Sequence, residues 1–203
     1  CGITGFKFTV GLVDTQGVAP LSKTLDSIGV FAKSMAETAL VYDALVDDPQ
    51  RATSAHAMTT ESARKLLQGL RIGRIAPHEL KDVQTEIVKA YEETLEFLKS
   101  AGAHITTLEL PCAIADLAPM AVNIMVTEGA AAYGALANDL TKPMDSGIRP
   151  RLQAGAKLLA IDYIAALENQ TLLKKQFANA FDQIDIFATP TGLTTAVPLT
   201  EVN

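Results

Sequence analysis

Residues 70–110 read LRIGRIAPHELKDVQTEIVKAYEETLEFLKSAGAHITTLEL, and this stretch predicts the fold class. Two short runs rich in apolar and β-branched residues, 70–76 and 104–110, are bounded by Gly or Pro, as is typical of strands. The segment between them, 83–101, has the length and spacing of a helix. A strand, a crossover helix and a second strand form a βαβ unit, whose two strands are expected to be parallel.

The predicted helix over 83–101 has one apolar face. Its apolar residues recur every three or four positions and therefore share a side of the helix: Val83, Ile87, Tyr91, Leu95 and Leu98. We expect Asp82 to cap the start of this helix and Gly102 to end it in a left-handed conformation.

The rest of the chain extends this pattern. Ser34 with Glu37 three residues later is a capping box, which predicts a helix that stops at Asp47-Asp48-Pro49, before a loop over 47–60. The further predicted elements are a buried helix over about 120–138, a helix near 148–158, a long helix capped by Asp162, and a strand over 185–191. We predict a single α/β domain over residues 1–203, with a mainly parallel or mixed sheet flanked by helices.

The composition is that of a globular protein and argues against nucleic-acid-binding, membrane-spanning and disulfide-rich proteins. The 203 residues are 48% hydrophobic and 20% charged, with a formal net charge of −6, as expected of a globular protein. The sequence has no basic cluster of the kind that binds nucleic acid and no apolar run long enough for a membrane span. Two cysteines, Cys1 and Cys112, are too few for a disulfide framework and are expected to be reduced, buried thiols. No export signal is visible, so the expected location is cytoplasmic.

Common catalytic motifs are missing from the sequence. It contains no G-x-S-x-G elbow, no P-loop and no G-x-G-x-x-G segment. The histidines His56, His78 and His104 are isolated from one another and from the cysteines, so we expect no metal site. His78 and His104 are expected to be ordinary surface residues.

Two polar segments next to prolines, Ser22-Lys23 after Pro20 and the arginines on either side of Pro150, are expected to have structural roles. Ser22-Lys23 resembles a serine–lysine dyad, but adjacent side chains generally point apart, and PLSKTLD has the composition of a turn. We expect Asp26 to hold this turn by accepting backbone amides. Arg149 and Arg151 are expected to be a solvated pair.

Glu128 is the most informative single residue, because it lies in the apolar segment 120–138. A carboxylate in such a helix needs hydrogen-bond partners or a polar cavity. Either it is a hydrogen-bonded structural glutamate, or it lines a pocket together with Met125, which lies on the same helix face. Both interpretations remain open.

The opening of the chain resembles the amidase signature family. That family has a segment C-G-x-x-G-x-K-P-T-x-G, then a turn P-x-S-x-S-L-D-x-x-G-P, then a helix opening A-R-S-x-x-D-x-A. The matching residues are Cys1, Gly2, Gly5, Lys7, Thr9, Gly11, Pro20, Ser22, Leu25, Asp26, Gly29, Ala32, Lys33, Ser34 and Ala39. The segments TEGAAAY, AIDYIAAL and DIFATPT are similar to later family motifs. Phe8 and Val30 replace prolines of the pattern, and Gln170 falls near a common arginine.

The resemblance implies hydrolysis of carboxamide C–N bonds by two serines and a lysine, without metal or organic cofactor. It places all three residues N-terminal to Cys1, so no catalytic residue is assigned here and the amidase fold is expected to be incomplete at both ends. It implies a small-molecule amide substrate and places the helix over 120–138 near the substrate channel, so Met125 and Glu128 either face the substrate or belong to the packed core. It is compatible with a homo-oligomer. Two alternatives stay open: a glutamine-hydrolysing subunit of a tRNA-dependent amidotransferase, and a non-catalytic amidase-derived scaffold.

Overall fold

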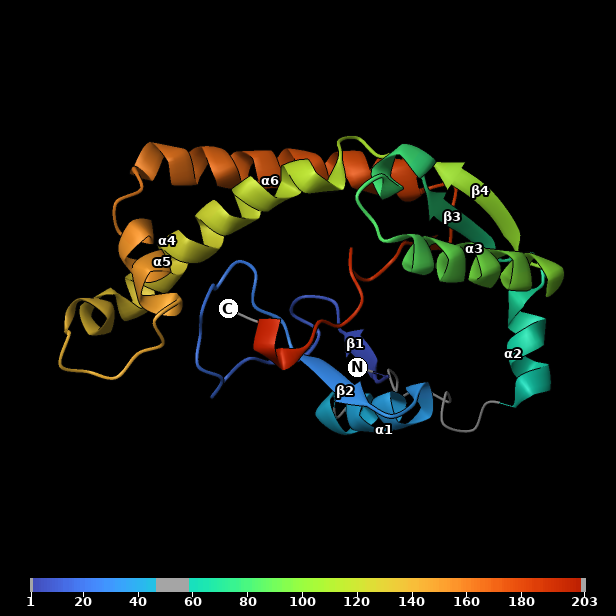
Figure 1. Cartoon of the computed structure of the whole chain (residues 1–203), viewed down its shortest axis with the longest axis horizontal. Helices are drawn as coiled ribbons and strands as arrows, with labels where there is room; N and C mark the ends of the chain where they lie inside the picture. The colour runs from blue at the N-terminus through green and yellow to red at the C-terminus, as the bar shows by residue number, and fades with distance from the viewer. Residues whose placement is uncertain (1, 47–58, 202–203) are drawn as a thin grey trace. The chain divides into compact units, whose positions relative to one another are not determined.

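The computed structural model describes residues 2–46 and 59–201. These residues form two compact units (Figure 1). One, here called the sheet unit, holds residues 59–114 and 173–201; the other, the helical unit, holds 2–46 and 115–172. The single domain over residues 1–203 stays a prediction.

The sheet unit contains the predicted βαβ arrangement. Strands β3 (Arg71–Ile75), β4 (His104–Leu108) and β5 (Ile186–Ala188) lie in the order β4-β3-β5, and both neighbouring pairs are parallel. Helix α3 (Thr85–Ser100) connects β3 to β4, as Figure 1 shows. The α/β class and the parallel sheet predicted from the sequence are therefore confirmed.

Helix α3 packs its apolar face into the core of this unit. Ile75, Leu80, Tyr91 and Leu95 form a buried cluster. The Tyr91 hydroxyl accepts a hydrogen bond from the Ile75 amide (3.1 Å) and donates one to the Ala188 carbonyl (2.9 Å). It thus joins the carboxyl ends of β3 and β5.

The ends of α3 test two capping predictions. Gly102 has φ of +104°, as predicted, because the left-handed conformation is accessible to glycine without steric cost. The prediction for Asp82 is wrong: the N-cap is Gln84, without a side-chain cap bond. A 3-10 helix (Pro77–Leu80) precedes α3, and the Val83 amide bonds to the Leu80 carbonyl, so the chain turns after Asp82. Helix α2 (Thr60–Leu67) was not predicted from the sequence.

The N-terminal part of the helical unit is a small sheet covered by a helix. Strands β1 (Thr4–Lys7) and β2 (Gly29–Ala32) are antiparallel, and Phe8, Val13 and Tyr42 form the buried core beside them. Helix α1 (Met35–Val46) begins with the predicted capping box, in which the Ser34 hydroxyl accepts from the Glu37 amide and the Glu37 carboxylate accepts from the Ser34 amide. The predicted stop at 47–49 and most of the predicted loop over 47–60 lie outside the described residues.

Three further helices follow: α4 (Leu117–Asn138), α5 (Ile148–Gly155) and α6 (Ala160–Phe181), the last of which continues into the sheet unit. Pro119 is tolerated because it lies in the first turn of α4, where amides lack intrahelical partners. Asp162 does not cap α6 but lies inside its first turn, where a carboxylate still suits the helix dipole. Two 3-10 turns complete the list of elements: Ile114–Asp116 and Leu199–Glu201.

Helices α4 and α5 approach each other closely at Gly155. A Cβ atom added to Gly155 would lie 2.0 Å from the Val126 carbonyl oxygen, so the backbones are in direct contact at this point. This contact requires a residue without a side chain.

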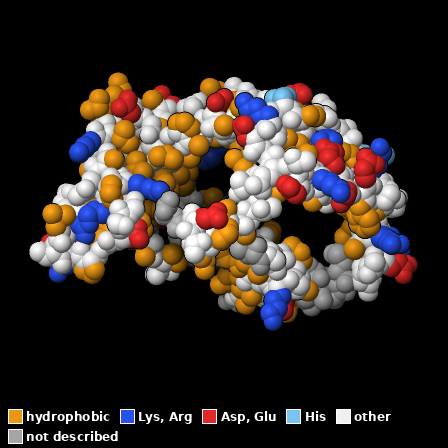
Figure 2. All heavy atoms as spheres, viewed as in Figure 1, with side chains coloured by type: hydrophobic (Ala, Val, Ile, Leu, Met, Phe, Trp, Pro, Cys, Tyr) orange, Lys and Arg blue, Asp and Glu red, His pale blue; other side chains and the backbone are white. Residues whose placement is uncertain are grey.

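Hydrophobic side chains also reach the surface. Figure 2 shows hydrophobic side chains over β1, β2 and α1. In β2 and α1, Phe31 is 79% exposed and Leu40 is 53% exposed. Within the described residues, no helix is both long and apolar enough to cross a membrane.

Candidate functional site

The turn over residues 20–27 is built around Asp26. Its Oδ2 accepts the amides of Leu21 (2.8 Å) and Ser22 (3.0 Å). The Ser22 carbonyl in turn accepts the amides of Leu25 and Asp26. The prediction that Asp26 holds this turn through backbone amides is confirmed.

Glu128 of α4 receives four hydrogen bonds. Its Oε2 accepts from the Ser22 hydroxyl (2.5 Å) and from the Thr24 amide (3.0 Å). Its Oε1 accepts from the Thr24 hydroxyl, through a very short bond, and from the Tyr163 hydroxyl (2.7 Å). One carboxylate thus joins the turn, α4 and α6.

Gly129 allows the turn to come this close to α4. A Cβ atom at this position would lie 2.9 Å from Leu152 Cδ2 and 3.1 Å from Leu21 Cδ1. The sequence pair Glu128-Gly129 therefore combines the acceptor with the space that its donors need.

The surroundings of Glu128 keep it ionised. Burial by itself raises the pKa of the Glu128 carboxyl, but the hydrogen bonds from Ser22, Thr24 and Tyr163 outweigh burial and lower this pKa to about 2. The hydrogen bond to Glu128 also raises the pKa of Tyr163, as does burial. Glu128 is therefore a carboxylate anion whose hydrogen-bond donors all belong to the protein.

A pocket of about 370 Å³ opens beside this network. Four apolar residues and four polar residues line it: Pro20, Leu21, Ala131 and Ala132, and Lys23, Thr24, Glu128 and Tyr163. A pocket that combines apolar walls with a few convergent polar groups is typical of small-molecule sites. Met125 lies one turn before Glu128 and is partly buried, but is outside the set of described residues that line this pocket.

Tyr163 was not identified from the sequence as a site residue. It lies 35 positions from Glu128 in the segment AIDYIAAL, and no local pattern marks it as a partner for a carboxylate. The available signal was a tyrosine near the start of a predicted helix, because a buried tyrosine hydroxyl usually needs a hydrogen-bond partner.

The geometry does not support a Ser22–Lys23 dyad. Ser22 is 1% exposed, donates its hydroxyl proton to Glu128 and accepts the Leu25 amide (3.2 Å), whereas Lys23 is exposed. Ser22 is therefore a structural hydroxyl.

The expectation of a solvated arginine pair is wrong for Arg149. Its guanidinium donates to the carbonyls of Ala137 (2.6 Å), Asp139 (3.2 Å) and Lys142 (2.6 Å). Arg149 thus satisfies the Ala137 carbonyl at the end of α4, which has no intrahelical partner, and the carbonyls of Asp139 and Lys142 just after that helix. Arg151 is exposed.

Histidines and cysteines form no site among residues 2–46 and 59–201. His78 and His104 are exposed, as predicted, and Cys112 is a partly buried free thiol. His56 and Cys1 lie outside the described residues. No group of three or more His, Cys, Asp or Glu side chains in the described ranges is arranged to hold a metal ion.

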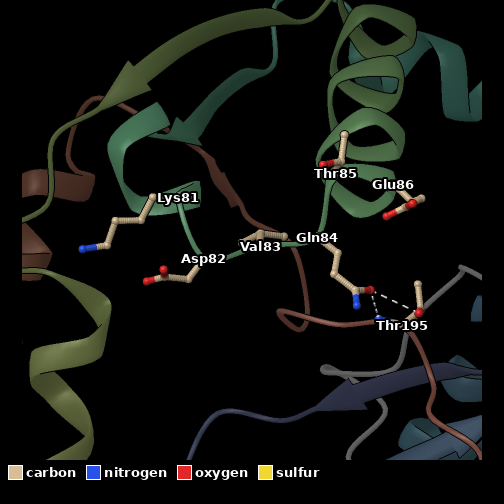
Figure 3. A pocket seen from close by; sticks show the side chains of 7 residues that line it. All are labelled: Lys81, Asp82, Val83, Gln84, Thr85, Glu86 and Thr195. Atoms are coloured by element: carbon tan, nitrogen blue, oxygen red, sulfur yellow. Dashed lines mark hydrogen bonds between the residues drawn. The ribbon is translucent and has the colours of Figure 1, made fainter.

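A second hollow, of about 560 Å³, lies at the start of α3 in the sheet unit (Figure 3). Gln84 Oε1 accepts from the Thr195 amide (2.8 Å) and hydroxyl (3.2 Å), and Figure 3 shows both bonds. The Gln84 amide donates to the Leu193 carbonyl (2.8 Å). These contacts attach the segment after β5 to α3, and this hollow contains no residue that the sequence analysis assigned to a site.

Comparisons with known proteins agree on one family. The family model "Amidase" matches residues 1–203. A glutamyl-tRNA(Gln) amidotransferase subunit of Thermosynechococcus vestitus is 31% identical over 225 residues, which cover 97% of this chain and 46% of that protein. An amidase of Pseudomonas putida is 27% identical, with 94% of this chain and 42% of that protein covered.

Solved structures share the fold. A crystal structure of an amidase superposes with a TM-score of 0.80 at 21% identity, over 98% of this chain and 42% of that chain. The chain thus spans less than half the length of the relatives it matches.

Proposed function

The chain belongs to the amidase family, and we propose on that basis that the whole protein hydrolyses carboxamide C–N bonds. The match of the family model to all 203 residues carries this proposal. In the proposed mechanism a serine attacks the amide carbon, a lysine relays protons through a second serine, and backbone amides stabilise the oxyanion. We place these catalytic groups N-terminal to Cys1, so residues 1–203 alone are expected to be inactive.

Within this scheme the helical unit supplies part of the substrate side. The pocket beside Glu128 supports this role, because it combines apolar walls with a fixed polar network. We propose that Met125, one turn earlier on α4, lies on the same side. Met125→Ala and Met125→Phe should then change the relative kcat/KM for small and bulky amides with little change in stability. A loss of stability of about 2–5 kcal/mol for the truncation, with an unchanged ranking of substrates, would instead assign Met125 to the core.

Ammonia release by the full-length protein tests the activity. A panel of aliphatic, aromatic and amino-acid carboxamides, with the isolated 1–203 segment as the control, measures both activity and its dependence on the rest of the chain. Release by the full-length protein alone supports the proposal. Failure with every amide would favour the non-catalytic scaffold.

A second candidate is the glutamine-hydrolysing subunit of a tRNA-dependent amidotransferase. The 31% identity to a glutamyl-tRNA(Gln) amidotransferase subunit favours it. The two candidates differ in what the reaction needs: a free-standing amidase acts alone, whereas such a subunit is expected to need partner subunits and a charged tRNA. Either activity fits a cytoplasmic protein, which fractionation of the source cells would test. Native mass determination would test the proposed homo-oligomer.

A further inference from the structure

The pocket beside Glu128 has a hydrogen-bonding character that its residue types do not reveal. It is lined by one carboxylate, two hydroxyls and one ammonium group, together with apolar side chains. Residue types alone would suggest a site in which Glu128 holds a cation. The hydrogen bonds lead to a different conclusion.

Glu128 has no acceptor site left for a ligand. A carboxylate offers about four lone-pair sites on its two oxygens. Ser22, Tyr163 and Thr24, which contributes both its amide and its hydroxyl, supply four donors. A ligand that donates to Glu128 would have to displace one of these protein groups.

The same bonds turn the two pocket hydroxyls into acceptors. Thr24 and Tyr163 each have one hydroxyl proton, and both protons are directed to Glu128 Oε1. A hydroxyl keeps lone pairs after it has donated its proton, so both oxygens can accept from a ligand. Because both hydroxyls bond to one carboxylate oxygen, the two acceptors lie close together.

Lys23 and the apolar residues complete the site. Lys23 is an exposed residue of the lining, so its positive charge offsets the negative charge of Glu128 and the pocket suits an uncharged ligand. The remaining wall is formed by Pro20, Leu21, Ala131 and Ala132, which can only contact an apolar group.

We propose that this pocket binds a primary carboxamide with a short apolar chain, in which the amide NH₂ donates to Thr24 Oγ1 and Tyr163 Oη. In this arrangement the amide oxygen accepts from Lys23, and the chain packs on the alanines of α4. Glu128 acts as a positioning residue, because it orients the two hydroxyls without touching the ligand. This assignment rests on the proposed amidase function for its substrate class.

The test measures binding of three ligands of equal length to the full-length protein: butyramide, butyrate and n-butylammonium. Ligand-observed NMR at low temperature, where turnover is slow, gives the affinities. Ammonia release is measured in parallel. We expect butyramide to bind most tightly. Tyr163→Phe, which removes one acceptor, should weaken its binding about tenfold, as expected for one lost hydrogen bond.

Three further variants separate the pocket from the network. Ala132→Leu fills the pocket without changing a polar group and should weaken butyramide binding at least tenfold. Ala135→Leu, at an exposed position of α4 outside the lining, is its matched control and should bind like the wild type. Ser22→Ala removes a donor to Glu128 that belongs to a residue outside the lining, and should keep the order of ligands.

The outcomes distinguish the two proposals. Wild-type affinity in Ala132→Leu, tighter binding of n-butylammonium, or no butyramide binding would each overturn the site. If ammonia is released but Ala132→Leu has no effect, the amidase function stands and the site is wrong. If the binding pattern holds without ammonia release, the site stands and the proposed function fails.

Discussion

The Ser22 hydroxyl donates a hydrogen bond of 2.5 Å to Glu128 Oε2, across 106 positions of the chain. Thr24 and Tyr163 bind the same carboxylate, so Glu128 determines how the turn over 20–27 lies on α4 and α6. The first two predictions concern this carboxylate.

Glu128→Gln should lower the free energy of unfolding by about 2 kcal/mol, because the amide side chain has one acceptor oxygen instead of two and leaves donors unpaired. Urea denaturation of the full-length protein measures this change. Glu96→Gln on the exposed face of α3 is the control and should change stability by no more than about 0.5 kcal/mol. Equal effects of the two substitutions would show that the network contributes little.

The contribution of Glu128 should depend on pH. Its folded-state pKa of about 2 lies below the ordinary value of 4.5, so its stabilising effect is complete above pH 4.5 and is lost as pH falls towards 2. The difference in unfolding free energy between wild type and Glu128→Gln should be constant from pH 7 to 5 and decrease below that. A difference that stays constant down to pH 3 would contradict the low pKa.

Asp26→Asn should destabilise the full-length protein by about 1 kcal/mol, because Asp26 Oδ2 accepts two backbone amides of the turn. Thermal or urea unfolding measures the loss. The pH–rate profile of amide hydrolysis should keep its shape, since Asp26 is a structural acceptor. A shifted profile at unchanged stability would point to a catalytic role instead.

Gly155→Ala should destabilise by about 1–3 kcal/mol, because the new Cβ would lie 2.0 Å from the Val126 carbonyl and force α4 and α5 apart. Gly134→Ala is a matched control within α4, where the new Cβ meets no atom within 4 Å. That control should be neutral or stabilise by up to about 1 kcal/mol through helix propensity. The prediction fails if both variants unfold at the same urea concentration.

The sequence was sufficient for the parts of the fold that depend on local periodicity. The apolar spacing in α3 and the flanking strands predicted the parallel pairing of β3 and β4, and Ser34 with Glu37 predicted the start of α1. Glu128 could be identified as unusual, because a carboxylate in an apolar helix requires partners.

The partners of Glu128 could not be predicted, because they depend on how distant segments pack. Tyr163 is brought to Glu128 by the position of α6, and Arg149 reaches the end of α4 only because the loop between α4 and α5 folds back. Asp82 does not cap α3 for a similar reason, since the 3-10 turn before α3 makes Gln84 the N-cap. Local sequence patterns indicate candidate caps and site residues, but which of them make the contacts depends on tertiary packing.

The most direct test of the central claim is ammonia release from carboxamides by the full-length protein, measured with and without partner subunits and charged tRNA. We expect release to require the full-length chain and to fall at least tenfold in kcat/KM for small amides in Ala132→Leu but not in Ala135→Leu. No release from any carboxamide, glutamine included, under either condition would contradict the assignment of this protein as an amide-hydrolysing enzyme.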